Sequence, residues 1–387
     1  MDKTNVKGVR MEFRDLKKQY QTLKVDIDRA ISEVLDSSQF IMGKQVKKLE
    51  EELAEYVGRK YCITCANGTD ALSLSISALG IGKGDAVFVP DFTFFSTAEI
   101  VEYAGATPVF VDVERDTYNI SADNLRIKIK EVINDKKLNP KAIIPVDLFG
   151  QTPDYEQIQT IADEYNLEIL EDGAQGFGGE YKGKKACSFG IISTTSFFPA
   201  KPLGCYGDGG AIFTDSEELC ELIKSLRVHG KGTEKYDNVR IGINSRLDTI
   251  QAAILLEKFK AFHMYELDRI NEAAEQYGRY LEGYVQIPHV MTKSYSSWAQ
   301  YTIKLSSRDK RDTLKETLSK KEIPSMIYYP KGLHQQTAFA KYGCGDDMFP
   351  VTSELCDTVL ALPIHPYIEK NEVELVAKEI IKFVENR

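Results

Sequence analysis

Short apolar segments alternate with runs of helical spacing through the first half of the chain, and this alternation allows few folds. The apolar segments, which we predict to be strands, are 61–66, 86–89, 108–113, 142–148, 167–170, 193–197 and 211–214. The runs between them that we predict to be helices are 71–79, 96–103, 122–133 and 155–165. Short buried strands separated by helices are typical of a mostly parallel sheet with helices on both faces. We therefore predict an α/β domain with a mostly parallel seven-stranded sheet.

The rest of the chain predicts helices before this sheet and a smaller domain after it. Apolar residues recur at helical spacing in 26–35 and 46–57, with a break at 40–43, and again in 247–262. From about residue 278 the pattern changes to predicted strands at 301–305 and 325–329 and a final helix at 372–385. A chain of 387 residues exceeds what one core usually organises. We predict a large domain of residues 1–260 and a small C-terminal α+β domain of residues 261–387.

Charge, hydropathy and cysteine usage argue against several classes of function. The net charge of −9 argues against nucleic acid as a partner, because no surplus of lysine and arginine is available to displace phosphate counterions. No apolar run approaches the roughly 20 residues that span a bilayer, and Met1–Arg10 is charged, so we expect no membrane association and a cytoplasmic location. Seven cysteines, an odd number, do not suggest a disulfide framework, and Cys62 and Cys65 lie in a predicted buried strand, which favours a structural role.

Lys201 stands between a predicted strand end and a turn dense in glycine, which favours a confined lysine over a solvated one. Judged alone, a lysine beside proline in a loop is usually solvated. In mostly parallel sheets, however, functional groups gather at the carboxyl ends of the strands. Further segments follow predicted strands in this way, and we expect them to share one site with Lys201: 68–69, 90–97, 147–151 and 172–175.

Two of these segments carry groups that suit a phosphorylated aromatic cofactor. Gly68 and Thr69 follow a strand and open a helix, where backbone N–H groups and a hydroxyl can bind an anion, although a simple N-cap would explain the same residues. Asp172 ends an apolar strand, where it could cap a helix or hold a ring nitrogen in its protonated form. Pyridoxal phosphate needs a lysine, an acid, a phosphate-binding site and an aromatic face together, and Phe94 could supply that face.

Four motifs stand in order along the chain: Gly68-Thr69-Asp70-Ala71-Leu72, Glu171-Asp172-Gly173-Ala174-Gln175, Ser196-Phe197-Phe198-Pro199-Ala200-Lys201 and Asn244-Ser245-Arg246-Leu247-Asp248. Together they resemble the DegT/DnrJ/StrS family of nucleotide-sugar aminotransferases, and the resemblance extends from Phe13 to the C-terminal helix. It implies a fold type I enzyme that uses pyridoxal phosphate and works as a homodimer with both sites at the subunit interface. It also implies two half-reactions, in which L-glutamate gives up an amino group that a nucleotide-linked keto-sugar then receives.

The resemblance also implies roles for the residues that match its motifs. Lys201 would bind the cofactor as a Schiff base and move the proton at the Cα of the amino donor. Asp172 would pair with the pyridine nitrogen, Gln175 would lie beside the phenolic oxygen, and Phe94 would stack on the ring. The phosphate group would be bound by Gly68, Thr69 and Ser196 of the same chain, together with Asn244 of the partner subunit. No metal ion is implied.

The identity of the sugar rests on a narrower resemblance. Residues 199–210 look most like the branch that aminates C3 of UDP-2-acetamido-2-deoxy-3-oxo-glucuronate, in the biosynthesis of cell-surface polysaccharides such as O-antigen. Arg227 and Arg246 fit this branch as substrate-binding residues, because a guanidinium pairs well with a uronate or with the carboxylate of glutamate. Either arginine could instead be a charge on a helix surface.

Two positions depart from the pattern of the family. Asp147 stands where many relatives carry histidine, and Tyr328-Tyr329-Pro330 stands where close relatives carry His-Tyr-Pro. We expect Asp147, Tyr328 and Tyr329 to lie near the sugar, so the choice of substrate could differ. The alternative substrate is a UDP- or dTDP-linked keto-deoxyhexose that is aminated at C3 or C4.

Enzymes and proteins of other classes fit the sequence less well. A nicotinamide-dependent dehydrogenase would need G-x-G-x-x-G at the start of a helix and an acid about 20 residues later, and the chain has neither. A sugar dehydratase of the same scaffold would lack the lysine at position 201. A regulatory protein without catalytic activity would bind the cofactor but would not convert a substrate. The sequence contains no added nucleic-acid-binding segment that would support that alternative.

Overall fold

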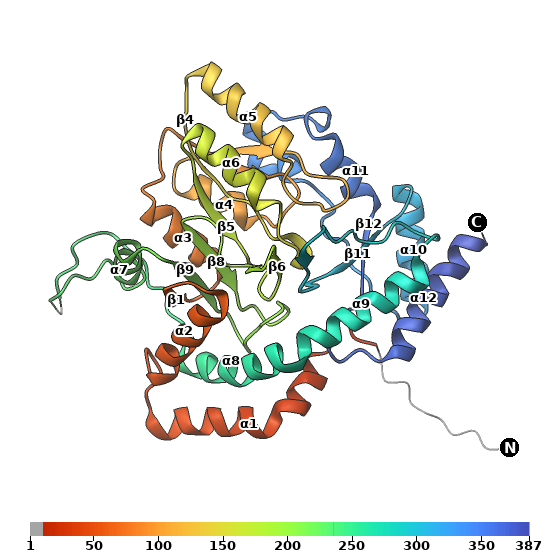
Figure 1. The fold of residues 1–387 in the computed structure, drawn as a ribbon, viewed down its shortest axis with the longest axis horizontal. Coiled ribbons are helices and arrows are strands. Elements are labelled where there is room, and N and C mark those ends of the chain that lie inside the picture. Colours follow the sequence, from red (N-terminus) through yellow and green to blue (C-terminus); the bar gives the residue numbers. More distant parts are fainter. Residues whose placement is uncertain (1–10, 235, 387) are drawn as a thin grey trace.

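Two helices precede the central sheet in the computed structural model, which describes residues 11–234 and 236–386. These are α1 (Leu16–Ser37) and α2 (Lys44–Val57), and they are separated by the break expected near residues 40–43. The side chain of Asp15 accepts a hydrogen bond from the backbone N–H of Lys18 and so begins α1. Figure 1 shows α1 along one edge of the molecule, beside α8 (Thr249–Ala261). The charged segment 1–10 lies outside the described residues.

A seven-stranded sheet forms the centre of the molecule, in the order β1-β9-β8-β5-β4-β2-β3. Its strands are β1 (Tyr61–Cys65), β2 (Asp85–Pro90), β3 (Thr107–Val111), β4 (Asn139–Ile143), β5 (Glu168–Asp172), β8 (Ile192–Ser196) and β9 (Gly210–Thr214). Only β9 runs against its two neighbours, and the other adjacent pairs are parallel. The predicted mostly parallel sheet is therefore confirmed.

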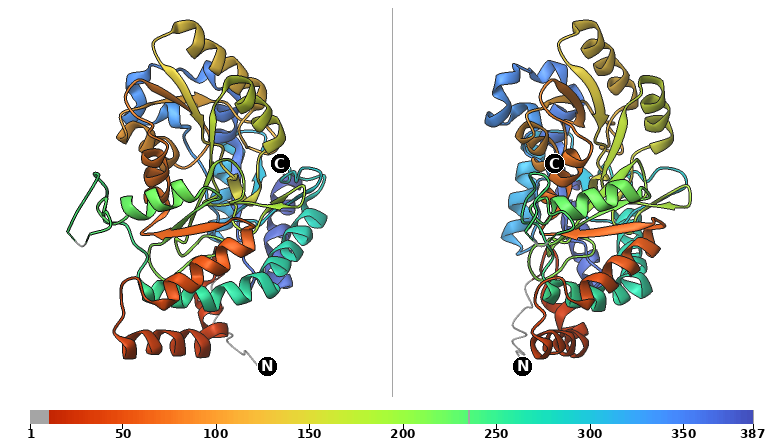
Figure 2. Two further views of the ribbon diagram at one scale, coloured as in Figure 1. Left: turned by 60° about the vertical axis from the view of Figure 1, so that its left-hand side comes forward. Right: turned by 90° about the vertical axis from the view of Figure 1, so that its left-hand side faces the viewer.

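Helices cover both faces of this sheet. On one face lie α3 (Gly68–Ala78), α4 (Ser96–Tyr103) and α7 (Glu217–Leu226), which share a core with Val87 and Val89. On the other face lie α5 (Ala122–Asp135) and α6 (Tyr155–Tyr165), which pack on Phe88, as well as α2 and α8. Val87, Phe88 and Val89 are consecutive in β2 and alternate between the two cores, because successive side chains of a strand point to opposite faces of the sheet. Figure 2 shows β1 between α7 on one side and α2 with α8 on the other.

Two predicted strands differ from the structure. The regular strand expected at 142–148 ends at Ile143, although Val146 still forms a parallel bridge with Asp172, and the short 3₁₀ helix η1 (Leu148–Gly150) follows. A Cβ at Gly150 would lie 2.5 Å from the backbone nitrogen of Trp298, so this turn needs glycine. The strand expected at 325–329 is a loop in which only Met326 pairs with a strand residue, Ala361. Three two-residue strands were not predicted: β6 (Glu180–Tyr181), β7 (Lys184–Lys185) and β10 (Ser294–Tyr295).

The C-terminal part of the chain builds a second core. This part of the chain contains η2 (Phe262–Glu266), α9 (Leu267–Leu281), β11 (Tyr301–Lys304), α10 (Arg308–Lys320), α11 (Pro350–Thr358), β12 (Val359–Leu362) and α12 (Lys370–Glu385). The second core is formed by residues of α9, β11, α10, β12 and α12. The predicted boundary at residue 260 falls inside the helical run formed by α8, η2 and α9, so no flexible linker marks it. The proposed division into 1–260 and 261–387 stays a prediction. In the described part of the chain, no helix has the length and apolar character needed to cross a membrane.

The segment 333–349 connects this C-terminal part to the central sheet. Leu333, Phe339 and Phe349 belong to the core of the sheet rather than to the C-terminal core. At the same place His334 Nδ1 lies 2.5 Å from Asp91 Oδ2, and Asp91 is fully buried. Burial alone would lower the pKa of His334, but its hydrogen bonds to Asp91 and Asp346 raise the pKa above the ordinary value. Burial raises the pKa of Asp91, but the contact with His334 opposes this effect and favours the carboxylate, so the two side chains form a buried ion pair.

We expect His334→Ala to lower the free energy of unfolding by about 3 kcal/mol or more, because the carboxylate of Asp91 would stay buried without its partner. Chemical denaturation of the purified protein measures this loss. His289→Ala is the matched control, because His289 is exposed and its side chain has no hydrogen bond among the described contacts. Equal losses of unfolding free energy in the two variants would show that the buried pair of His334 and Asp91 does not stabilise the fold.

Candidate active site

One cavity of about 700 Å³ opens at the carboxyl ends of the strands. Its walls come from the start of α3, the β2–α4 connection, the ends of β5 and β8, and the loop 327–331. The cavity brings together nine of the residues predicted from sequence: Gly68, Thr69, Phe94, Asp172, Gln175, Ser196, Lys201, Tyr328 and Tyr329. The rule that functional groups meet at this edge of a parallel sheet therefore holds here.

A small anion-binding cradle lies where α3 begins. Asn67 caps the helix, because its side chain accepts a hydrogen bond from the backbone N–H of Asp70 at 2.8 Å. The hydroxyl of Thr69 is thus not needed as the cap. Gly68 lies so close to Ser196 that a Cβ at position 68 would be 2.7 Å from the Cβ of Ser196. Two hydroxyls and the amino end of a helix face the same space, which suits a phosphate group.

Asp172 is held at the end of β5 by two hydrogen bonds. Its Oδ2 accepts from the hydroxyl of Thr97 at 2.8 Å, and its Oδ1 accepts from the backbone N–H of Ala174 at 3.2 Å. Burial raises the pKa of Asp172 above its usual range, while these two donors and the nearby Lys201 act in the opposite direction. A cationic partner in the cavity would therefore stabilise the carboxylate form further.

Lys201 follows β8 and reaches the cavity as a half-buried amine. Burial lowers the pKa of Lys201 to about 8, against the opposing effect of Asp172. The guanidinium of Arg14 lowers the pKa further, and the same guanidinium donates to the carbonyl of Pro202. A larger fraction of this amine is therefore neutral, and nucleophilic, near neutral pH than for an ordinary lysine.

Aromatic side chains and one amide complete the cavity. The side chain of Gln175 accepts from the backbone N–H of Phe149 at 3.0 Å and donates to the hydroxyl of Tyr329 at 3.1 Å, so its orientation is set. The ring of Tyr328 contacts that of Phe13. Phe94 is 54% exposed, which leaves its ring available to a planar ligand in the cavity.

Three predicted site residues do not reach the cavity of their own chain. Arg227 is buried, and its Nη1 contacts Glu50 Oε1 at 2.7 Å and the carbonyl of Thr64 at 2.6 Å, so its contacts in this chain are structural. Asn244 and Arg246 are hydrogen-bonded to each other and lie on the segment 227–246, outside the residues that line the cavity. Figure 1 shows this segment extending from the body of the molecule beyond α7.

The expectation that Asp147 lies near the sugar is wrong for the cavity of this chain. Asp147 is fully buried and is absent from the cavity wall, although Val146 before it still forms a parallel bridge with Asp172. Conversely, Arg14, Lys331 and Gln300 were not predicted as site residues. Lys331 and Gln300 line the cavity from the C-terminal half. Arg14 lies near Lys201 through tertiary packing alone, which a local pattern cannot predict.

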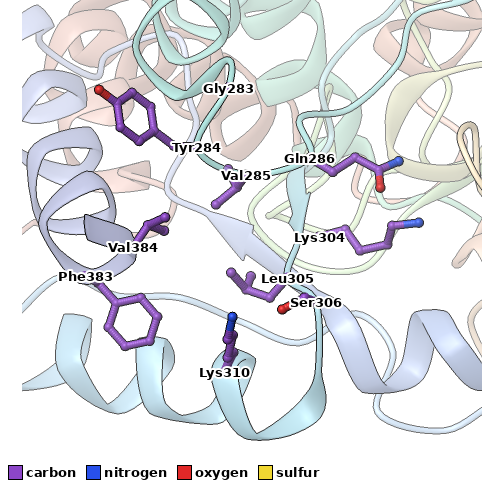
Figure 3. A pocket seen from close by; sticks show the side chains of 10 residues that line it. All are labelled: Gly283, Tyr284, Val285, Gln286, Lys304, Leu305, Ser306, Lys310, Phe383 and Val384. Carbon is purple, nitrogen blue, oxygen red and sulfur yellow. The ribbon is translucent and has the colours of Figure 1, made fainter. Parts of the chain in front are cut away.

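A second hollow, of about 420 Å³, lies in the C-terminal part and has a different character. Figure 3 shows its lining, with Phe383 and Val384 from the end of α12 and Lys310 from α10. Lys304 is paired with Glu354 at 3.2 Å. The hollow contains none of the predicted site residues, so we assign the chemistry to the cavity at the strand ends.

Known proteins resemble this chain over nearly its whole length. The model of the DegT/DnrJ/EryC1/StrS aminotransferase family matches residues 21–381. A Pseudomonas aeruginosa protein named UDP-2-acetamido-2-deoxy-3-oxo-D-glucuronate aminotransferase is 42% identical over 95% of this chain and 98% of its own length. A Geobacillus stearothermophilus protein named pleiotropic regulatory protein is 41% identical over 95% of this chain and 97% of its own.

Solved structures agree with these sequence matches. The crystal structure of a DegT DnrJ EryC1 StrS aminotransferase from Brucella abortus has a TM-score of 0.94 at 46% identity, and covers 96% of this chain and 99% of its own. A Bacillus subtilis protein solved with bound cofactor PMP has a TM-score of 0.84 at 30% identity, over 94% of this chain and 82% of its own. The fold type I architecture and pyridoxal phosphate as cofactor are thereby confirmed.

We expect the apoprotein to take up pyridoxal phosphate covalently at a rate that rises with pH and levels off above about pH 8, where Lys201 becomes neutral. The absorbance change after mixing measures this rate. Arg14→Gln should move the midpoint to higher pH, because the neighbouring positive charge is lost. Lys201→Ala is the control and should abolish uptake although the buried Lys258 remains. A midpoint unmoved in Arg14→Gln would contradict the role of that guanidinium.

Proposed function

This chain belongs to the DegT/DnrJ/EryC1/StrS aminotransferase family, and we propose that it transfers the amino group of L-glutamate to the keto group of a nucleotide-linked sugar. The observation that carries this proposal is the convergence of Lys201, Asp172 and the cradle of Gly68, Thr69 and Ser196 on one cavity. A lysine, an acid and a phosphate site are the parts that pyridoxal phosphate requires.

The residues present fit this cofactor. The cradle at the start of α3 has hydroxyl donors and a glycine whose Cβ would collide with Ser196. Asp172 offers a carboxylate whose two oxygens are already oriented, and Phe94 offers an exposed ring. When bound, pyridoxal phosphate supplies an electron sink for the carbon from which a proton is removed.

The side chains would divide the work as follows. Lys201 Nζ would hold the cofactor and then move a proton at the Cα of the amino donor, a task for which a pKa near 8 is well matched to neutral conditions. Asp172 would keep the ring nitrogen protonated, and Gln175 would donate to the phenolic oxygen. Phe94 would cover one face of the ring and exclude water from it.

The sugar that we propose is UDP-2-acetamido-2-deoxy-3-oxo-glucuronate, aminated at C3 in polysaccharide biosynthesis. The name of the Pseudomonas aeruginosa relative supports this choice. Tyr328, Tyr329 and Lys331 line the mouth of the cavity, where two hydroxyls and an ammonium group could contact the sugar and its acidic groups. The alternative is a keto-deoxyhexose linked to UDP or dTDP and aminated at C3 or C4.

A homodimer with shared sites is part of the proposal. The segment 227–246 exposes apolar side chains, including Ile241, which is 95% exposed, and Val239, which is 54% exposed. A second copy of the chain would cover them. Asn244 of the partner subunit would then reach the phosphate, and Arg246 of the partner subunit would reach a substrate carboxylate. We also propose a cytoplasmic location, which the seven free cysteines support.

We expect the purified protein to be yellow with pyridoxal phosphate, and the band of the Lys201-bound cofactor to bleach when L-glutamate is added. Lys201→Ala should lack that band. The band should return when the proposed 3-keto uronate is added to the amine form, and absorbance spectroscopy follows both changes.

Two outcomes separate the alternatives. Recovery of the band with only a 4-keto-sugar would refute the proposed C3 substrate. Stable binding of the cofactor with no response to any amino donor would favour a regulatory function, in line with the name of the Geobacillus stearothermophilus relative.

Mixing two inactive variants tests the shared site. Lys201→Ala and Arg246→Ala should each be inactive, yet dissociated and reassembled together they should regain about a quarter of the wild-type activity, because half of the dimers then contain one intact site. The double variant mixed with Lys201→Ala is the control and should stay inactive. Absence of any recovery in proven mixed dimers would place both residues in the site of one chain.

A further inference from the structure

A buried pair of acids lies directly behind the turn that carries Asp172 and Gln175. Asp147 and Glu171 are both fully buried. The backbone N–H of Asp147 donates to the carbonyl of Asp172 at 3.0 Å, and the N–H of Asp172 donates to the carbonyl of Pro145 at 2.9 Å. The acid pair is thus joined to the cavity wall by the backbone, although neither of its side chains lines the cavity.

The four carboxyl oxygens of this pair have different surroundings. Glu171 Oε1 accepts from the backbone N–H of Cys187 at 2.6 Å, and Oε2 accepts from that of Phe189 at 2.7 Å. Asp147 Oδ1 accepts from the hydroxyl of Tyr155 at 3.0 Å. Asp147 Oδ2 is buried and has no donor among the described residues. The carboxyl groups of Asp147 and Glu171 are close enough to act on each other, because each shifts the pKa of the other.

Two carboxylates in contact inside a protein do not both stay ionised, because desolvation and repulsion favour one shared proton. Three of the four oxygens already accept a hydrogen from a fixed donor, so the proton belongs on the fourth. We propose that Asp147 is a neutral acid, protonated on Oδ2, and that it donates this proton to ionised Glu171 and thereby positions the turn of Asp172 and Gln175. This inference does not depend on the proposed sugar.

The charges around the pair agree with this assignment. Burial and the carboxylate of Glu171 raise the pKa of Asp147 well above its usual range. The groups that face the pair are Tyr155 from α6, Cys187 from the segment before β8, and Asp172 on β5. Burial raises the pKa of Glu171 to about 7, while Arg59 and the backbone N–H groups of Cys187 and Phe189 act in the opposite direction and favour its ionised form.

Close packing connects this pair to the cavity. A Cβ at Gly176 would lie 2.2 Å from Asp147 Oδ2, and one at Gly173 would lie 3.4 Å from it. The turn 172–176 therefore rests on the carboxyl group of Asp147 with no space between them. Ionisation of Asp147 would place a second negative charge against Glu171 and beside Asp172, and would push this turn away. Asp147 is thus a positioning residue for the two side chains that face the cavity.

Two conservative variants of the holoenzyme test which acid carries the proton. Asp147→Asn keeps an acceptor for Tyr155 and a donor for Glu171, so we expect its thermal midpoint to stay within about 2 °C of wild type. Glu171→Gln places an N–H group against the N–H of Cys187 or Phe189, so we expect a loss of at least about 4 °C. The reverse order of the two losses would put the proton on Glu171 and overturn the proposal.

The pH dependence supplies a readout that packing alone would not change. A raised pKa means that folded Asp147 holds a proton that the unfolded chain releases above about pH 4. The unfolding equilibrium constant of the wild type, relative to that of Asp147→Asn, should therefore increase about tenfold per pH unit. This increase should begin at about pH 4 and continue up to the pKa of Asp147 in the folded protein. Infrared spectra should also show a protonated carboxyl band at neutral pH that Asp147→Asn lacks. Parallel pH profiles, or a band that persists in the variant, would overturn the proposal.

Discussion

The cavity depends on a close approach of two strand ends at Gly210. This residue begins β9 and pairs with Cys65, the last residue of β1, and with Ser196, the last residue of β8. A Cβ at position 210 would lie 2.4 Å from the carbonyl oxygen of Asn67, so only glycine lets the backbones meet. The start of α3 is thereby held against Ser196, and this contact creates the cradle. The dense run of glycines after Lys201 is explained by such packing.

The charged groups around the cavity control the protonation of its two central residues, Lys201 and Asp172. Lys201 is driven toward its neutral form by burial and by Arg14, while Asp172 restrains that effect. Asp172 in turn is supplied with two hydrogen-bond donors. Behind it the pair of Asp147 and Glu171 carries one negative charge instead of two. A second charge there would make ionisation of Asp172 harder, and the proposed pairing of Asp172 with a protonated ring nitrogen requires its anionic form.

Local sequence patterns predicted the sheet and most of the cavity, because both follow from short-range features. Strand and helix periods placed the strand ends, and the strand ends placed Thr69, Asp172 and Lys201. Contacts that depend on tertiary packing escaped prediction. Arg14 meets the carbonyl of Pro202 across 188 residues of chain. Asp147 was expected at the cavity because it follows a predicted strand, whereas its side chain is fully buried and packs against the turn at Gly176.

Arg227 shows how a residue can be relevant to a site that it does not touch. Its side chain joins α2 to β1 through Glu50 and the carbonyl of Thr64, and its own carbonyl accepts from the backbone N–H of Ser245 at 2.9 Å. The hydroxyl of Ser245 in turn accepts from the backbone N–H of Ala66 at 3.0 Å, one residue past β1. These bonds anchor the base of the segment 227–246 to the same strand end that leads into the cradle. In the proposed dimer, the sheet would therefore set the direction in which this segment presents Asn244 to the partner subunit.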